Sequence, residues 1–210
     1  MNLWPGIIYL AAAFLSGSVP WSWILGKFRG IDIRNEGSGN TGATNLFRVC
    51  GRGTGITGLL LDALKGALPV FAAKQGIAGV LSPVGDWLLG LTAIFAVLGH
   101  VFSPWLGFRG GKGVATALGV LVILSPLTLA SGLVVFALVL TITRYVSLGS
   151  ISAAVAVIPF VFIYEPGRLP VQIIICLVAV LVIVRHKSNI VKLLHGEENK
   201  FSFHGGGSNE

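Results

Sequence analysis

The sequence predicts an all-α integral membrane protein with seven transmembrane helices, its N-terminus outside and its C-terminus in the cytoplasm. Composition is the first reason: of 210 residues only 11% are charged and 54% are hydrophobic, whereas a soluble domain carries about 25% charged residues. The second is a series of long charge-free runs, which lack the alternation of polar and apolar residues typical of membrane β-strands. A disordered chain and an ordinary soluble domain are thereby excluded.

Each charge-free run predicts a membrane span, because a helix of about 20 apolar residues crosses the hydrocarbon core. The run 1–26 lacks the basic start of a signal peptide and is interpreted as the first span. The run 113–143 would form a helix of ~46 Å across a core of ~30 Å, and Ser125-Pro126 divides it. We expect one domain, residues 1–210, with spans at about 4–26, 54–74, 86–107, 113–125, 127–143, 149–164 and 169–185 and a short cytoplasmic tail, 186–210.

Basic residues set the orientation, because Lys and Arg in short loops stay in the cytoplasm. With seven spans, Lys74 and Arg168 lie on one side, Lys65 lies within a span, and the other 12 of the 15 basic residues lie on the opposite side. Leaving 113–143 undivided reduces this asymmetry to eight against six. Seven spans with a cytoplasmic C-terminus therefore fit better.

The first polar block on the cytoplasmic side runs from Gly37 to Asn45 and is followed by Arg48. Its glycines let backbone N–H groups turn toward an anion, and an arginine suits phosphate. A flexible polar loop joining two spans is the alternative interpretation. The arginines that flank this loop favour phosphate binding.

The second block contains Gly99-His100 and then Arg109-Gly110-Gly111-Lys112. Lys112 stands where a helix is predicted to start, and helix N-termini attract anions. The block is not a Walker A loop, since Gly113 follows the lysine. Anchoring to anionic lipid headgroups is the alternative for its cations. For His100, a structural role and a functional role are equally open interpretations.

Two further blocks, 144–150 and 185–200, lie on the same side. His186 and Asn189 are three residues apart and share a helix face. Asp62 and Lys65 have the same spacing inside the second span, where charges are functional candidates by default. A mutually neutralising structural pair is the alternative for them.

Together these blocks resemble one family over nearly the whole chain, the acyl-phosphate-dependent glycerol-3-phosphate acyltransferases of bacteria (the PlsY family). The segments that carry the resemblance are Gly17-Ser18-Val19-Pro20, Ser38 to Asn45 with Arg48, Asp62-x-x-Lys65-Gly66, Gly99-His100 through Thr116, Arg144-Tyr145-x-Ser147-Leu148 with Ser150-Ile151, and Arg185-His186-x-x-Asn189-Ile190. The family often has Lys in place of Arg109 and Arg in place of Lys192. Both differences keep the charge.

The resemblance implies transfer of a fatty acyl group from acyl phosphate to the 1-hydroxyl of glycerol 3-phosphate. Lysophosphatidic acid and inorganic phosphate are the implied products, at the cytoplasmic face of a bacterial inner membrane. Acyl phosphate, glycerol 3-phosphate and membrane lipid are the expected partners, together with the enzyme that makes acyl phosphate. Nucleic acid, metal and cofactor are not expected. A transporter is the rival class, but transporters often bind between repeated halves, and the sequence has no internal repeat.

By this resemblance the expected catalytic residues are Ser38, Lys112 and His186. The expected substrate-binding residues are Asn40, Thr41, Gly42, Asn45, Arg48, His100, Arg109, Gly110, Gly111, Arg144, Ser147 and Asn189. Lys112 would stabilise the carbonyl under attack. The general base stays open between His186 and the phosphate of the substrate, with the substrate-assisted route preferred. A covalent acyl-serine on Ser38 or Ser147 is a third route, but neither block supplies an adjacent base.

Overall fold

The computed structural model describes residues 4–76 and 84–201, and every regular element within these ranges is helical. The elements are α1 (Trp4–Ser18), α2 (Trp21–Phe28), α3 (Ala43–Cys50), α4 (Arg52–Gly76), α5 (Val84–Val101), the 3₁₀ turn η1 (Pro104–Leu106), α6 (Val114–Leu124), α7 (Pro126–Thr143), α8 (Val146–Tyr164), α9 (Leu169–Arg185) and α10 (Lys187–Leu194). The predicted all-α class is confirmed.

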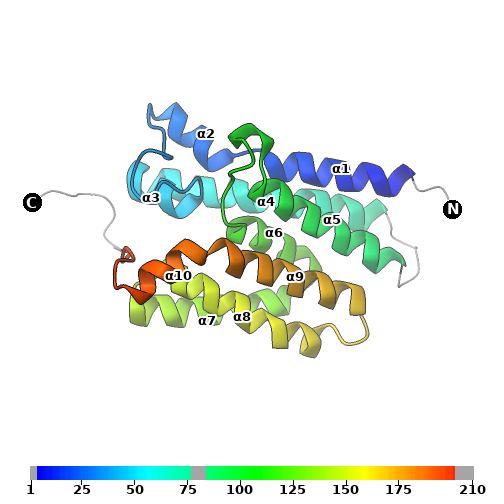
Figure 1. Ribbon diagram of the computed structural model, residues 1–210. Helices are drawn as coiled ribbons and strands as arrows, with labels where there is room; N and C mark the ends of the chain where they lie inside the picture. Colours follow the sequence, from blue (N-terminus) through cyan, green and yellow to red (C-terminus); the bar gives the residue numbers. More distant parts are fainter. Residues whose placement is uncertain (1–3, 77–83, 202–210) are drawn as a thin grey trace, which may run out of the picture.

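The long helices run side by side in one bundle, with α6 between two groups (Figure 1). One group contains α1, α4 and α5, and the other contains α7, α8 and α9. Helix α6 packs against α4, α5, α7 and α9, and the α5–α9 contact also joins the groups. Helices α2, α3 and α10 gather at the end of the bundle where the described chain ends, opposite the start of α1 (Figure 1).

Several of these helices fit a membrane by length and composition. Among the described residues, five helical segments are long and apolar enough to span, or six if α9 and α10, which meet at a bend of 52°, form one span. Helix α6 is apolar but has only 11 residues. The predicted multi-pass architecture is thus supported, while the count of seven and the orientation stay predictions.

Prolines account for two breaks between helices, one between α1 and α2 and one between α6 and α7. The predicted span 4–26 is two helices, because α1 ends at Ser18 and α2 begins at Trp21, after Val19-Pro20. Proline lacks the N–H that a helix interior requires. The predicted break at Ser125-Pro126 is confirmed, since Pro126 is the first residue of α7.

Small residues let the helices approach closely. A Cβ on Gly17 of α1 would collide with the carbonyl oxygen of Ala96 on α5. In the same way, a Cβ on Gly119 of α6 would collide with the carbonyl oxygen of Ala63 on α4. Glycine contacts of this kind are typical of packed membrane helices. The Gly119 contact sets α6 against α4, and the candidate site lies where α6 begins.

The segment 27–53 was expected to be a polar loop, and it contains the eight-residue helix α3. Leu46 is fully buried where α3 packs on α4, so the short helix has an apolar face of its own. Gly51, with φ of 84°, ends α3 in a conformation that favours glycine.

Candidate active site

A cavity of about 460 Å³ extends from the start of α6 into the space among α6, α7, α8 and α9. One part of its wall is polar and charged: Ser38, Asn40, Arg48, Lys112, Ser147, His186, Asn189, Lys192 and Glu198. The rest is mainly apolar and includes Leu121, Leu124, Leu129, Val157, Ile175 and Val178. A single cavity therefore joins an ionic end to a hydrocarbon-like slot.

Three helices begin at the polar end. The first residues of α3 (Ala43), α6 (Val114) and α8 (Val146) all line the cavity. The unpaired N–H groups of a helix start carry partial positive charge and favour anions. Three such starts around one space make its polar end suitable for phosphate.

Three cations reinforce this field. Arg48, Lys112 and Lys192 line the cavity, and the charged side-chain group of none of them makes a hydrogen bond or ion pair with another described residue. Burial lowers the pKa of Lys112 to about 8, an effect that nearby Lys192 and Arg48 increase and Glu198 opposes. A bound phosphate would relieve the mutual repulsion of these cations.

The glycine-rich loop is held in shape by one buried amide. Asn45 Nδ2 donates to the carbonyl oxygens of Ile33, Glu36 and Asn40 at 2.7, 3.0 and 3.0 Å. Its Oδ1 accepts from the backbone N–H of Ser38 at 2.8 Å. These contacts set the loop that presents Ser38. Asn45 also lines the cavity, so its predicted role in substrate binding stays a prediction.

His186 lies buried between α9 and α10 and faces the same cavity. Its Nδ1 lies 2.7 Å from the carbonyl oxygen of Val182, which can only accept, so Nδ1 carries the proton. Burial, assisted by Lys112, lowers the pKa of His186 to about 4. The imidazole is therefore neutral at pH 7, with Nε2 available as an acceptor.

Ser147 and Asn189 were predicted to bind substrate, and both side chains donate hydrogen bonds to Glu198. Glu198 was not predicted as a site residue. Ser147 Oγ and Asn189 Nδ2 each donate to Glu198 Oε1 at 2.8 Å, and Asn189 Nδ2 also lies 3.1 Å from Oε2. Lys192 was likewise not assigned to the site. Lys192 and Glu198 both belong to the polar block 185–200, and nothing in the sequence distinguished them from residues of an exposed tail.

Five predicted binding residues lie outside the cavity lining. Thr41 and Arg109 line a separate depression. Arg144 ends α7 with φ of 63°, and its carbonyl oxygen accepts from Phe201 N. Gly110 and Gly111 instead make room for His100, because a Cβ on either would collide with that residue. The other predicted site residues line the cavity, including Gly42 and His100.

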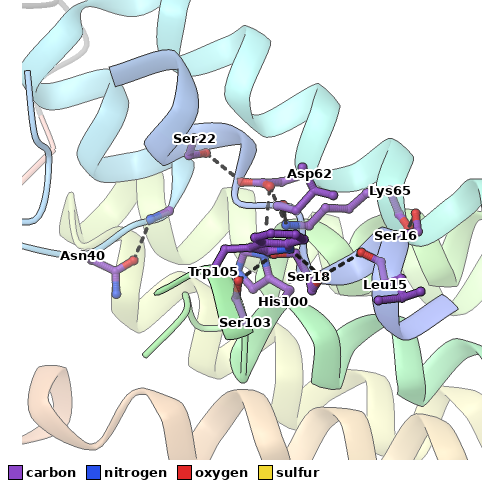
Figure 2. Close-up of polar contacts among 12 residues, drawn as sticks. Leu15, Ser16, Ser18, Ser22, Asn40, Asp62, Lys65, His100, Ser103 and Trp105 are labelled. Carbon is purple, nitrogen blue, oxygen red and sulfur yellow. Dashed lines mark hydrogen bonds and ion pairs between the residues drawn. The ribbon is translucent and has the colours of Figure 1, made fainter. Parts of the chain in front are cut away.

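Next to the cavity, a polar network crosses the bundle interior (Figure 2). Asp62 Oδ1 pairs with Lys65 Nζ at 2.8 Å, and Ser22 Oγ donates to Asp62 Oδ2 at 2.6 Å. Lys65 Nζ also donates to the carbonyl oxygen of Val19 at 2.6 Å. His100 Nδ1 lies 3.9 Å from Asp62 Oδ1. The network connects α4, α5 and the break between α1 and α2, which supports a structural role for Asp62 and Lys65, while Asp62 and His100 also line the cavity.

Comparison with known proteins identifies the family of this chain. Residues 7–196 match the family model described as glycerol-3-phosphate acyltransferase. A relative of that name from Trichlorobacter lovleyi is 50% identical over 196 residues, 93% of this chain and 97% of its own. One from Geobacter sulfurreducens is 46% identical over 195 residues, with 93% and 97% covered.

Two solved structures are also similar. One is the glycerol 3-phosphate form of PlsY, an integral membrane glycerol 3-phosphate acyltransferase, with a TM-score of 0.87, 36% identity, and 94% of this chain and 96% of that chain covered. The other is the lysophosphatidic acid form of PlsY, with a TM-score of 0.85 and the same identity and coverage. The chain therefore belongs to the glycerol-3-phosphate acyltransferase family of integral membrane enzymes.

Proposed function

We propose that this protein transfers a fatty acyl group from acyl phosphate to the 1-hydroxyl of glycerol 3-phosphate, giving lysophosphatidic acid and inorganic phosphate. The observation that carries the proposal is the cavity that joins an apolar slot to three cations, Arg48, Lys112 and Lys192, whose side chains have no partner among the described residues. The products of that reaction are one lipid and one phosphate. PlsY has been solved in glycerol 3-phosphate and lysophosphatidic acid forms, which supports the acceptor and the product.

The polar end would hold the phosphates and the apolar slot the acyl chain. Arg48 and the loop residues Ser38 and Asn40 cradle a phosphate, while Lys112 stabilises the negative charge that develops on the carbonyl oxygen. Ser147, His186 and Asn189 orient glycerol 3-phosphate. The acyl chain lies along the apolar residues of α6 to α9, which exclude water from it.

The reaction is a direct transfer. The 1-hydroxyl oxygen of glycerol 3-phosphate attacks the acyl carbonyl carbon, the bond from that carbon to the phosphate oxygen breaks, and inorganic phosphate leaves. The hydroxyl proton passes to a phosphate oxygen of the substrate. A phosphate monoester has a second pKa of about 6, whereas His186 has a pKa of about 4. A group with so low a pKa is a weak base at pH 7, which favours the substrate-assisted route.

The seven-span topology belongs to the same proposal, with one domain, the N-terminus outside, and the cavity facing the cytoplasm of a bacterial inner membrane. Helices α1 and α2 form the first span, α9 the last, and α6 a short one of ~16 Å. The Arg168–Asp86 and Arg168–Glu165 ion pairs, 2.7 and 2.6 Å, would lie at the outer surface. Reagent labelling of single cysteines at Gly167 and Lys187 from either side of sealed vesicles tests this orientation.

The decisive assay uses purified protein in detergent with palmitoyl phosphate and radiolabelled glycerol 3-phosphate. Formation of labelled lysophosphatidic acid is the expected result, and its absence with folded protein would overturn the enzymatic proposal. Palmitoyl-CoA in place of palmitoyl phosphate tests the donor separately, and we expect no product from it. An enzyme that makes acyl phosphate would supply this substrate in the cell.

A further inference from the structure

Glu198 is a part of the cavity that phosphate binding does not explain. Two carboxylates line the cavity among the described residues, and the other, Asp62, is paired with Lys65 at 2.8 Å. Glu198 acts electrostatically on both Lys112 and His186, so it lies close to the proposed reacting groups. Because a carboxylate repels phosphate, this position indicates that a different part of the substrate lies beside it.

The carboxylate has unused acceptor capacity. It receives Ser147 Oγ and Asn189 Nδ2 at 2.8 Å on Oε1, with a longer contact of 3.1 Å from Asn189 to Oε2. A carboxylate offers about four acceptor positions, so at least one remains. Asn189 Oδ1 is buried and accepts no hydrogen bond from the described residues. Two unused acceptors therefore lie on neighbouring side chains at the cavity.

The backbone around Glu198 is fixed on both sides. Glu197 N donates to the carbonyl oxygen of Lys192 at 2.8 Å, and Phe201 N donates to that of Arg144 at 2.7 Å. The Phe201 ring lies 5.1 Å from that of Phe47 on α3, measured between centroids. Glu198 is therefore a built part of the cavity wall.

We propose that Glu198 and Asn189 form a diol subsite that recognises the two hydroxyls of glycerol 3-phosphate. The inference rests on the proposed function. Glu198 accepts from the non-reacting 2-hydroxyl, a bond that can persist through acyl transfer. The Asn189 amide oxygen receives the 1-hydroxyl before that hydroxyl reacts. Glu198 is thus a positioning residue, and it disfavours the reversed orientation because that would bring phosphate against its carboxylate.

The test is a cycle that removes the carboxylate charge and the substrate hydroxyl separately and together. Glu198→Gln and wild type are assayed with glycerol 3-phosphate and with 3-hydroxypropyl phosphate, which lacks the 2-hydroxyl. We expect Glu198→Gln to lower kcat/KM for glycerol 3-phosphate by about 10- to 100-fold, and to have a much smaller effect on the analogue. Equal fold-losses with both substrates would overturn the proposal. Glu197→Gln, at an exposed neighbour, is the matched control.

Inhibition by inorganic phosphate shows whether Glu198 positions the substrate or only holds the C-terminal tail in place. If Glu198 only held the tail in place, Glu198→Gln would also weaken phosphate inhibition. We expect that inhibition to be unchanged or stronger, because the substitution removes a negative charge near Lys112. If Glu198→Gln does not fold, Ser147→Ala, which removes one donor to the same carboxylate, replaces it in the cycle with the same expected coupling. Wild-type activity is measured alongside, so failure of the reaction and failure of the diol subsite are distinguishable.

Discussion

Lys65 Nζ, inside the second long helix, donates a hydrogen bond of 2.6 Å to the carbonyl oxygen of Val19, at the break in the first predicted span. A break frees backbone carbonyls that lipid cannot satisfy. A second side chain satisfies a neighbouring carbonyl at the same break: Ser103 Oγ donates to the carbonyl oxygen of Ser18 at 2.6 Å (Figure 2). The hydrogen bond to this free backbone carbonyl gives a structural reason for the charged Lys65 inside a predicted span.

Removing Lys65 alone leaves Asp62 buried without its cation. We expect Lys65→Met to destabilise the protein by about 3–5 kcal/mol. The double variant Asp62→Asn/Lys65→Met has no buried charge at the pair and should lose less. Thermal unfolding in detergent measures both, with exposed Lys187→Met as the control. A double variant less stable than Lys65→Met would contradict the pairing.

Lys112 gives the enzyme an alkaline limit. Its pKa, lowered by burial to about 8, is below that of an ordinary lysine, so the cation is present at pH 7 and lost as the pH rises past 8. We expect kcat/KM for glycerol 3-phosphate to fall above that pH, since this parameter reports groups of the free enzyme. Lys112→Arg should lose activity at pH 7 but show no decline near pH 8, because arginine stays charged. An unchanged decline in the variant would assign it to another group.

His186 distinguishes the two routes for the proton. If the substrate phosphate is the base, the neutral imidazole mainly orients glycerol 3-phosphate, and His186→Ala should raise KM more than it lowers kcat. The pH profile between 5.5 and 7 should keep its shape, because the pKa of His186, lowered to about 4 by burial, lies below that window. A large loss of kcat with unchanged KM would instead identify His186 as the base.

Local patterns predicted most of the fold, because apolar runs and prolines act within one segment. The start of α7 at Pro126 followed from the residue type alone. The contacts of Asn45 and the position of Arg109 outside the cavity lining did not follow from residue type, since they depend on how a loop folds over distant backbone. The hydrogen bond from Asn45 to the carbonyl oxygen of Ile33, 12 residues away in the sequence, is one such contact. Glu198 was missed for the same reason, because its place depends on contacts with α8 and α10.

The apolar slot gives a prediction about the acyl chain. Ala154 of α8 is buried and lines the cavity, whereas its neighbour Val155 is 53% exposed on the outer surface of the bundle. Ala154→Phe would fill part of the slot, so a long chain should no longer fit, while a short chain that ends before Ala154 should still bind. We expect kcat/KM for palmitoyl phosphate to fall at least about tenfold more than that for octanoyl phosphate.

Val155→Phe adds the same ring on the side of α8 away from the cavity and serves as the matched control. It should leave the ratio of the two donors unchanged. Unfolding temperatures of both variants in detergent show whether any loss of activity reflects a damaged fold. Equal losses with both donors in a folded Ala154→Phe protein would mean that the acyl chain lies elsewhere, for instance in a groove on the lipid-facing surface.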